Sequence, residues 1–241
     1  MKRPALLAAA PLLLCAAAAC ADPGYYVVTV YDNPGVRTLD LRYWTVSRPD
    51  AQTQTWPEAG FGWNVNGRWY TELFASWIGS SGTATRLSSL NWQNDVLLTQ
   101  GQYPFDLAVH LQYIHPYDPA DARTLEFGPV LQTDIGRTQL NVNLFFERGF
   151  GANARPTRLK YQWQLRHRWR PWLHFGAQGF GEPGRWDHFS PRDAQSHRAG
   201  PALYGALPIG DRRLAWQAAW LAGSTYGRHG HMVTLRTTFD F

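Results

Sequence analysis

Apolar and polar residues alternate with a period of two along most of the chain. In the segment FDLAVHLQYI (105–114) every odd-numbered residue is apolar, whereas Asp106 and His110 occupy even positions. The same alternation recurs over 140–147 and 159–166. Because successive side chains of a strand point to opposite faces, each segment predicts a β-strand with one apolar and one polar face.

Twelve such segments follow one another along the chain. They cover residues 37–46, 58–65, 69–78, 86–98, 104–114, 124–135, 138–148, 157–167, 172–181, 199–208, 213–222 and 231–241. Most are close in length to the ~9–11 residues that a tilted strand needs to cross a bilayer, and no run of ~18 apolar residues follows Asp22. We therefore expect an all-β fold, a transmembrane antiparallel up-and-down β-barrel of about twelve strands.

The connections between these segments alternate in length. Those after odd-numbered segments are long, as in 115–123 and 181–198, whereas those after even-numbered segments are tight, as in 66–68 and 136–137. Outer-membrane barrels combine long outer loops with short periplasmic turns. We therefore assign the long links to the outer side, and we expect a left-handed Gly67 in the first tight turn.

The first residues have the features of a secretory signal. Lys2 and Arg3 precede an apolar run over 5–19, and Ala19-Cys20-Ala21 is a small-x-small cleavage pattern. We expect residues 1–21 to be a signal peptide, residues 22–241 to form the barrel, and the cleaved chain to reach the bacterial outer membrane. Lipidation of Cys20 is an alternative, although the Leu expected three places before such a cysteine is missing.

Composition supports an envelope barrel. Both cysteines lie within the predicted signal, and 15% of the chain is aromatic, with 12 Trp, 11 Tyr and 12 Phe. Such a share of aromatic residues is typical of interfacial girdles. Cleavage removes two of the 23 basic residues and none of the 18 acidic ones, which lowers the net charge from +5 to +3. This small excess, without a basic run containing aromatics, indicates no nucleic-acid partner.

The segment VTLRTTFDF ends the chain on an apolar face that closes at Phe241. A terminal aromatic residue on an alternating strand resembles the signal by which the barrel-assembly machinery recognises its clients. We therefore expect that machinery and outer-membrane lipid as partners.

Three stretches in the C-terminal half, 125–241, carry a family resemblance: LEFGPVLQTDIGRTQLNVNLFFERGFG, WLHFGAQGFGE and RAGPALYGALPIG. They resemble a family of uncharacterised proteobacterial outer-membrane β-barrel proteins. The resemblance implies a fold and a location but no catalytic residues. The segment GSTYGRHGH departs from the more acidic loop associated with that family, which leaves ligand preference open.

The polar strand faces would line the lumen, because ionisable groups in hydrocarbon are prohibitively costly. If 136–137 is a two-residue turn, Glu126 lies opposite Glu147, with Lys160 and Arg158 entering the next strand at the same height. These groups form a charged constriction or, alternatively, a salt-bridge network that braces the wall. The candidate lumen residues are Glu126, Glu147, Lys160, Arg158, Glu72, Asp106, His110, Asp134 and Arg166.

A passive channel or binding barrel for small solutes is our first functional hypothesis. A membrane-embedded hydrolase of lipid or peptide and a plugged structural barrel are the alternatives. His188 and Ser190 have a His-x-Ser spacing, but no carboxylate is placed by register to complete a triad. A protease site at Asp187-His188 would need a second acidic pair on another loop; Asp118 and Asp121 could serve, although aspartates beside Pro119 are usually turn formers. We assign no catalytic residue, cofactor or metal. His229 and His231 are two residues apart and could jointly bind a metal ion on a strand; alternatively, they belong to a solvated loop tip.

The tryptophans are expected mainly at strand ends and on outer faces, at the headgroup level. This group comprises Trp44, Trp56, Trp63, Trp69, Trp77, Trp92, Trp172 and Trp220. Fewer aromatic residues are candidates for the lumen face, namely Tyr70, Phe74, Phe145, Phe180 and Tyr204.

Overall fold

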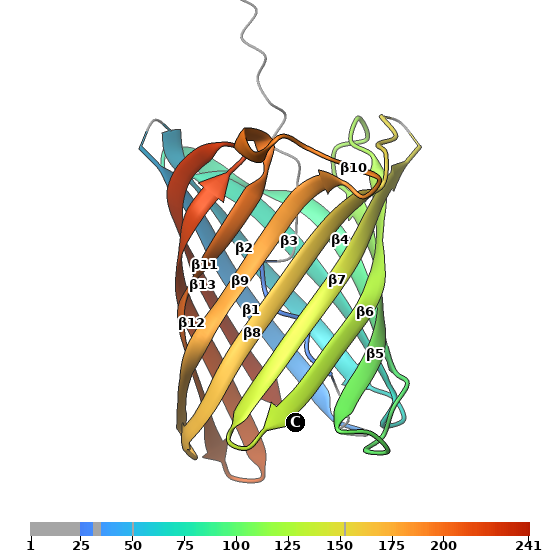
Figure 1. Cartoon of the computed structure of the whole chain (residues 1–241), viewed down its shortest axis with the longest axis vertical. Coiled ribbons are helices and arrows are strands. Elements are labelled where there is room, and N and C mark those ends of the chain that lie inside the picture. The colour runs from blue at the N-terminus through green and yellow to red at the C-terminus, as the bar shows by residue number, and fades with distance from the viewer. Residues whose placement is uncertain (1–24, 31–34, 50, 152) are drawn as a thin grey trace, which may run out of the picture.

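Twelve long antiparallel strands close into a barrel in the computed structural model (Figure 1). The structure describes residues 25–30, 35–49, 51–151 and 153–241. The predicted signal peptide, its cleavage site and Cys20 lie outside the described residues. The expected all-β, twelve-stranded, up-and-down architecture is confirmed. No helix among the described residues is long and apolar enough to cross a bilayer.

The barrel strands are 12 to 15 residues long, which exceeds most of the predicted segments. They are β1 (Arg37–Arg48), β2 (Ala51–Asn64), β3 (Trp69–Ser80), β4 (Thr83–Leu97), β5 (Phe105–Pro116), β6 (Arg123–Ile135), β7 (Thr138–Phe150), β8 (Arg158–Arg170), β9 (Leu173–Arg185), β11 (Ser196–Ile209), β12 (Arg212–Thr225) and β13 (Arg228–Asp240). A two-residue strand, β10 (His188–Phe189), and a short 3₁₀ helix, η1 (Arg192–Ala194), lie between β9 and β11.

Closure brings the first and last strands together. β1 pairs with β2 on one side and with β13 on the other, so that Thr38 lies opposite Asp240. Each of the remaining long strands pairs with the long strands that precede and follow it in the chain. The short β10 pairs only with the end of β9. We call the end where β1 begins and β13 finishes the turn end, and the opposite end, which carries β10, the loop end.

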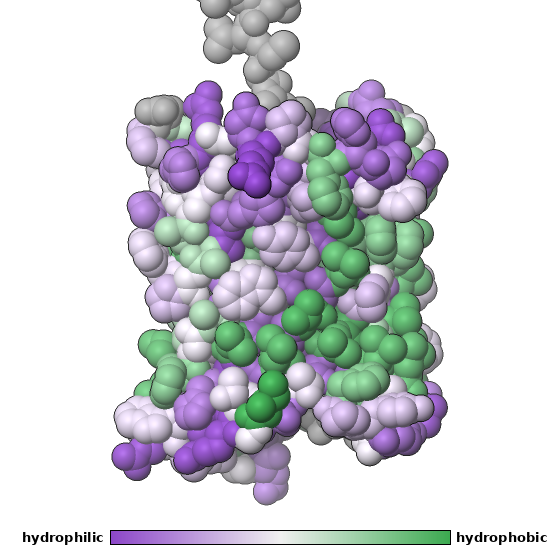
Figure 2. All heavy atoms as spheres, in the orientation of Figure 1, coloured by the Kyte–Doolittle hydropathy of each residue, from purple (hydrophilic) through white to green (hydrophobic). Residues whose placement is uncertain are grey.

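The alternation of the sequence separates the outer wall from the lumen. In β1, Leu39, Leu41 and Tyr43 are exposed, whereas Asp40 and Arg42 between them are buried. Figure 2 shows apolar side chains gathered on the wall between two hydrophilic rims. This is the inverse of a soluble barrel, because the apolar face is turned outward.

The predicted difference in link length is wrong for three of the loop-end connections. β2 already begins at Ala51, and only two residues separate β3 from β4 and β12 from β13. The strands continue as hairpins into segments that were predicted to be loops. At the turn end the predictions hold for Gly67 and Gly136, whose φ angles are +73° and +60°, as tight hairpin turns require.

Two tryptophans face the lumen instead of the lipid. Trp44 and Trp56 are buried and stacked, with ring centroids 3.9 Å apart and planes inclined by 8°. Trp44 has the same strand parity as Asp40 and Arg42, so alternation places it inside. Of the six other tryptophans predicted to face outward, Trp77 is half-buried and five are exposed, namely Trp63, Trp69, Trp92, Trp172 and Trp220.

Candidate functional site in the barrel lumen

The segment Tyr25–Val30 runs through the lumen ahead of β1 (Figure 1). Residues Tyr25 to Val28 are all at least nine-tenths buried, and none of them belongs to a strand of the barrel. Its side chains project alternately to two sides of the lumen. Tyr25 and Val27 pack against Trp44, Phe180 and Leu221, whereas Tyr26 and Val28 pack against Val130 and Phe145.

Tyr25 is held near the loop end by a buried ion pair. Arg198 of β11 bonds Glu182 of β9 at 3.0 Å and donates a hydrogen bond of 2.5 Å to the Tyr25 hydroxyl. The Tyr25 and Tyr226 hydroxyls both donate to Glu182. The Arg198 guanidinium also lies 4.2 Å from the Tyr25 ring centroid. This contact set ties the lumen segment to two strands and to the β12–β13 hairpin.

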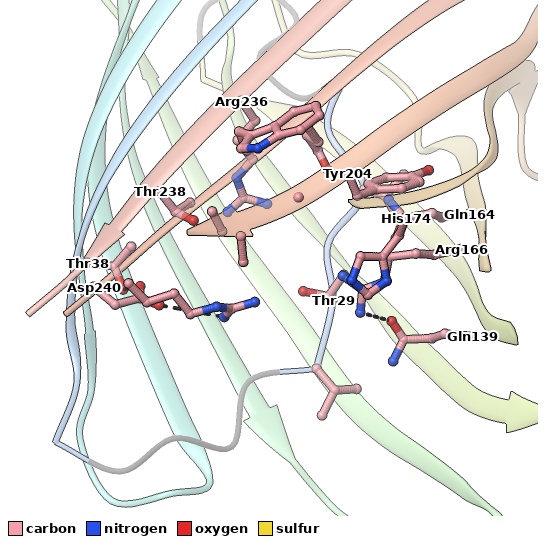
Figure 3. Close-up of a pocket in the computed structure, with 18 of the residues that line it drawn as sticks. Thr29, Thr38, Gln139, Gln164, Arg166, His174, Tyr204, Arg236, Thr238 and Asp240 are labelled. Atoms are coloured by element: carbon pink, nitrogen blue, oxygen red, sulfur yellow. Dashed lines mark hydrogen bonds and ion pairs between the residues drawn. The ribbon is translucent and has the colours of Figure 1, made fainter. Parts of the chain in front are cut away.

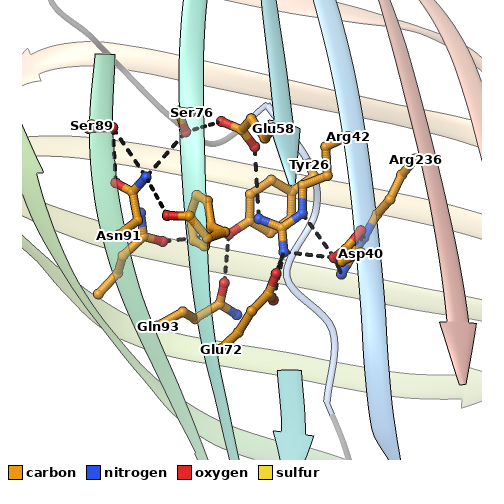
Figure 4. A network of polar contacts seen from close by, with 12 residues as sticks. Tyr26, Asp40, Arg42, Glu58, Glu72, Ser76, Ser89, Asn91, Gln93 and Arg236 are labelled. Atoms are coloured by element: carbon orange, nitrogen blue, oxygen red, sulfur yellow. Dashed lines mark hydrogen bonds and ion pairs between the residues drawn. The ribbon is translucent and has the colours of Figure 1, made fainter. Parts of the chain in front are cut away.

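Tyr26 is held on the opposite wall by the Arg42 network, which comprises Asp40, Arg42, Glu58, Glu72 and Arg236 (Figure 4). Arg42 lies 2.7 Å from Asp40, 2.6 Å from Glu72 and 3.8 Å from Glu58. Arg236 of β13 bonds the same Asp40 at 2.6 Å, so the network crosses the seam where the barrel closes. The Tyr26 hydroxyl donates to Gln93 at 2.7 Å.

Two glycines of β2 make room for this network. A Cβ atom at Gly60 would collide with the Glu72 carboxylate, and one at Gly62 would collide with the Tyr70 ring. Tyr70 in turn donates a hydrogen bond of 2.9 Å to Glu72. The two glycines of GFGW (60–63) thus leave space over β2 for Tyr70 and for Glu72, which reaches Arg42.

The middle of the segment is bound through its backbone. The Val28 N–H donates to the Gln162 side chain at 3.1 Å, and its carbonyl accepts a bond of 2.8 Å from Asn143. Gln162 and Asn143 belong to β8 and β7 and also bond each other at 3.0 Å. Side-chain amides therefore satisfy backbone groups that would otherwise be buried without partners.

A second group of charges, the Lys160 network, comprises Asp95, His110, Glu126, Glu147 and Lys160. Lys160 lies 2.9 Å from Glu126 and 2.8 Å from Glu147, and Glu126 is opposite Glu147 as the turn register predicts. His110 bonds Asp95 at 2.6 Å and lies 3.5 Å from Glu126. The network joins four neighbouring strands, β5 to β8, and continues through Asp95 to β4.

The two networks are linked through the lumen segment. Gln93 accepts from Tyr26 and donates to Asp95 at 2.6 Å. The Arg42 guanidinium lies over the Tyr26 ring, and hydrogen bonds continue from Tyr26 through Gln93 to the Lys160 network. The networks join strands of the wall to one another and surround the lumen segment, which fits the bracing role. A role as a constriction that selects solutes stays a prediction.

The predicted lumen residues do not form a single constriction. His110, Glu126, Glu147 and Lys160 come together, and Arg158 pairs with Glu147 in the strand register. Glu72 belongs instead to the Arg42 network. The remaining three lie toward the turn end, where Asp106 bonds Thr99, Asp134 pairs with Arg168 and Arg166 bonds Gln139.

Several lumen residues were missed because the strands extend beyond their predicted ends. Glu58, Glu182 and Arg198 stand at or beyond those boundaries, yet all three are buried in the lumen. The lumen segment itself was unassigned. Its signal was the apolar run YYVV outside any predicted strand, which needs cover from water.

A cavity of about 430 Å³ lies toward the turn end of the lumen (Figure 3). Val27, Thr29 and Val30 of the lumen segment form one side of it. Strands β8, β11, β12 and β13 contribute Arg166, Tyr204, Arg213 and Arg236, respectively. The lumen segment is thus anchored near the loop end by Tyr25, and its later residues border a polar space toward the turn end.

The candidate hydrolase residues are not brought together. His188 and Ser190 lie in the β9–β11 link, and His188 hydrogen-bonds neither Ser190 nor a carboxylate among the described residues. Asp187 pairs with Arg185 at 2.8 Å. Across the described ranges, no three His, Cys, Asp or Glu side chains are grouped to hold a metal ion.

Comparison with solved structures identifies the class of fold. An outer-membrane channel from Pseudomonas putida F1 superposes with a TM-score of 0.60 at 10% identity, over 91% of this chain and 99% of that one. The KdgM porin superposes with a TM-score of 0.55 at 8% identity, over 85% of this chain and 99% of that one. The NanC porin gives 0.55 at 12% identity, over 84% and 98%.

At these identities the likeness shows a shared fold, that of outer-membrane β-barrels. No family model matches the chain, and no curated protein matches it in sequence.

Proposed function

We propose that this chain is a passive outer-membrane channel for small solutes, narrowed by its own segment Tyr25–Val30. The observation that carries the proposal is the charged, amide-rich lumen, which surrounds this segment and widens into the 430 Å³ cavity. Buried ionisable groups are costly, and an apolar filling would stabilise a purely structural barrel at lower cost. A polar lumen instead suits the passage of hydrated solutes.

The proposed function includes an orientation in the outer membrane, with the apolar outer face of the strands toward lipid. With the signal peptide removed, the turn end would face the periplasm and the loop end the cell exterior. Outer-membrane lipid would contact the exposed apolar wall. The barrel-assembly machinery would recognise the last strand through Phe241, which lies at the seam and exchanges backbone hydrogen bonds of 2.9 and 3.1 Å with Arg37.

A plugged structural barrel is the second candidate, favoured by the contacts that hold Tyr25 and Tyr26. Single-channel recording in a planar bilayer separates the two. The chain from Asp22 to Phe241, shown to be folded, is expected to give discrete conductance steps, and Glu147→Gln is expected to reduce their cation preference. Silence from the folded wild type together with silence from a variant lacking residues 25–30 would contradict the channel and favour the structural barrel.

A further inference from the structure

Positive charge outnumbers negative charge on the wall of the turn-end cavity. Among the described residues, its lining contains four arginines, Arg166, Arg168, Arg213 and Arg236, and one carboxylate, that of Asp240. Three of the four have carboxylate neighbours. Arg168 lies 2.9 Å from Asp134, Arg236 lies 2.6 Å from Asp40, and Arg213 lies 3.8 Å from Asp240.

Arg166 differs from the other three. Its guanidinium donates to the neutral side chain of Gln139, and it forms no ion pair among the described residues (Figure 3). Its Nε atom is buried and has no hydrogen-bond partner there. The same is true of Nδ1 of His174, which lies beside it on the cavity wall. A half-buried guanidinium with no carboxylate partner in the described part of the chain is costly, and an anion in the cavity would reduce that cost.

The rest of the lining suits a solute with hydroxyl groups. Gln132, Gln164 and Gln217 present amides, and Thr29 and Thr38 present hydroxyls. These groups both donate and accept hydrogen bonds, as sugar-like hydroxyls do. The volume of about 430 Å³ falls within the range of small-molecule sites.

We propose that the turn-end cavity is a binding site for a small hydroxylated organic anion, whose carboxylate or phosphate group contacts Arg166. Arginine suits this role because its planar guanidinium can form two parallel hydrogen bonds to a carboxylate or phosphate. This inference rests on the proposed function, because it names the charge of the solute that the channel would carry. Binding of that solute can nevertheless be measured without measuring conduction.

Isothermal titration calorimetry of the folded protein in detergent tests the site. Gluconate and glycerol 3-phosphate serve as the two anion probes, and sorbitol serves as the neutral counterpart of gluconate. We expect at least one anion to bind and sorbitol to give no binding heat. Arg166→Gln is expected to weaken anion binding at least about tenfold, the loss typical of a charged hydrogen bond.

Arg212→Gln is the matched control, because Arg212 is an exposed arginine of β12 that does not line the cavity. It should leave the dissociation constant within about twofold. The proposal is overturned if neither anion binds the folded wild type, if sorbitol binds as tightly as gluconate, or if Arg166→Gln binds the anion unchanged. Binding by a non-conducting barrel would leave the site standing and overturn only the channel.

Discussion

The guanidinium carbon of Arg42 lies 3.7 Å from the ring centroid of Tyr26. This contact joins a strand of the wall to the segment inside the barrel. Arg236 approaches the same ring at 5.1 Å, so two arginines from adjacent strands contact one tyrosine. Desolvated cation–π contacts contribute about 2 kcal/mol each. The Arg42 network therefore holds the lumen segment as well as the barrel seam.

Removing the charge of Arg42 is expected to destabilise the barrel. Arg42→Met would leave Asp40, Glu58 and Glu72 buried with less compensation, at a cost of about 3–5 kcal/mol. Urea unfolding in detergent, followed by tryptophan fluorescence, measures this change. The double variant Arg42→Met/Glu72→Gln should recover part of the loss, and the exposed Arg37→Gln should shift the midpoint little. Equal midpoints for Arg42→Met and Arg37→Gln would show that the network contributes nothing.

The inward placement of Trp44 predicts protection from lipid. In bilayers of brominated lipid, Trp92→Phe should remove fluorescence that the lipid quenches, because Trp92 is exposed on the outer wall. Trp44→Phe should remove unquenched fluorescence instead. Steady-state quenching of the two variants beside the wild type gives the comparison. A loss of quenched signal in Trp44→Phe would place this residue in the lipid and contradict the structure.

The Lys160 network predicts opposite effects of two substitutions on ion selectivity. Lys160→Gln removes a positive charge from the lumen and should raise the preference for K⁺ over Cl⁻. Glu147→Gln removes a negative charge 2.8 Å from Lys160 and should lower that preference. Reversal potentials across a KCl gradient report both changes. Shifts of the same sign, or no shift in either variant, would exclude this network from the conduction path.

Phe241 predicts an assembly phenotype without a folding defect. Its ring lies 6.2 Å from that of Phe61 and 6.0 Å from that of Phe239. Phe241→Ser should lower the amount of barrel in outer membranes of cells while leaving refolding in detergent nearly unchanged. Phe150→Ser, at the exposed end of β7, is the control. Equal cellular levels of the two variants would argue against recognition through Phe241.

The alternation of β1 shows why the sequence predicts the barrel well. The outward Leu39 and Leu41 and the inward Asp40 and Arg42 follow from a local period of two that lipid and water impose on every strand. The opposition of Glu126 and Glu147 was predicted for a similar reason, because a two-residue turn fixes the register of both strands.

Long-range contacts of the lumen could not be predicted in the same way. Tyr25 and Glu182 are 157 residues apart, and their contact depends on barrel closure and on the path of the N-terminal segment. Strand ends carry a weaker signal than strand centres, so Glu58 and Arg198 were left out of the candidate site. Trp44 faces inward, contrary to the prediction, because strand parity decides which side of the wall a residue occupies whatever its aromatic character.

Single-channel conductance with and without residues 25–30 tests the central claim most directly. The claim is that this segment narrows a polar lumen. The folded deletion variant should give steps several times larger than those of the wild type, because removing four buried side chains, Tyr25 to Val28, widens the path. Tyr25→Ala/Tyr26→Ala should give an intermediate increase. Equal conductance in the wild type and the deletion variant, both confirmed as folded, would contradict the account.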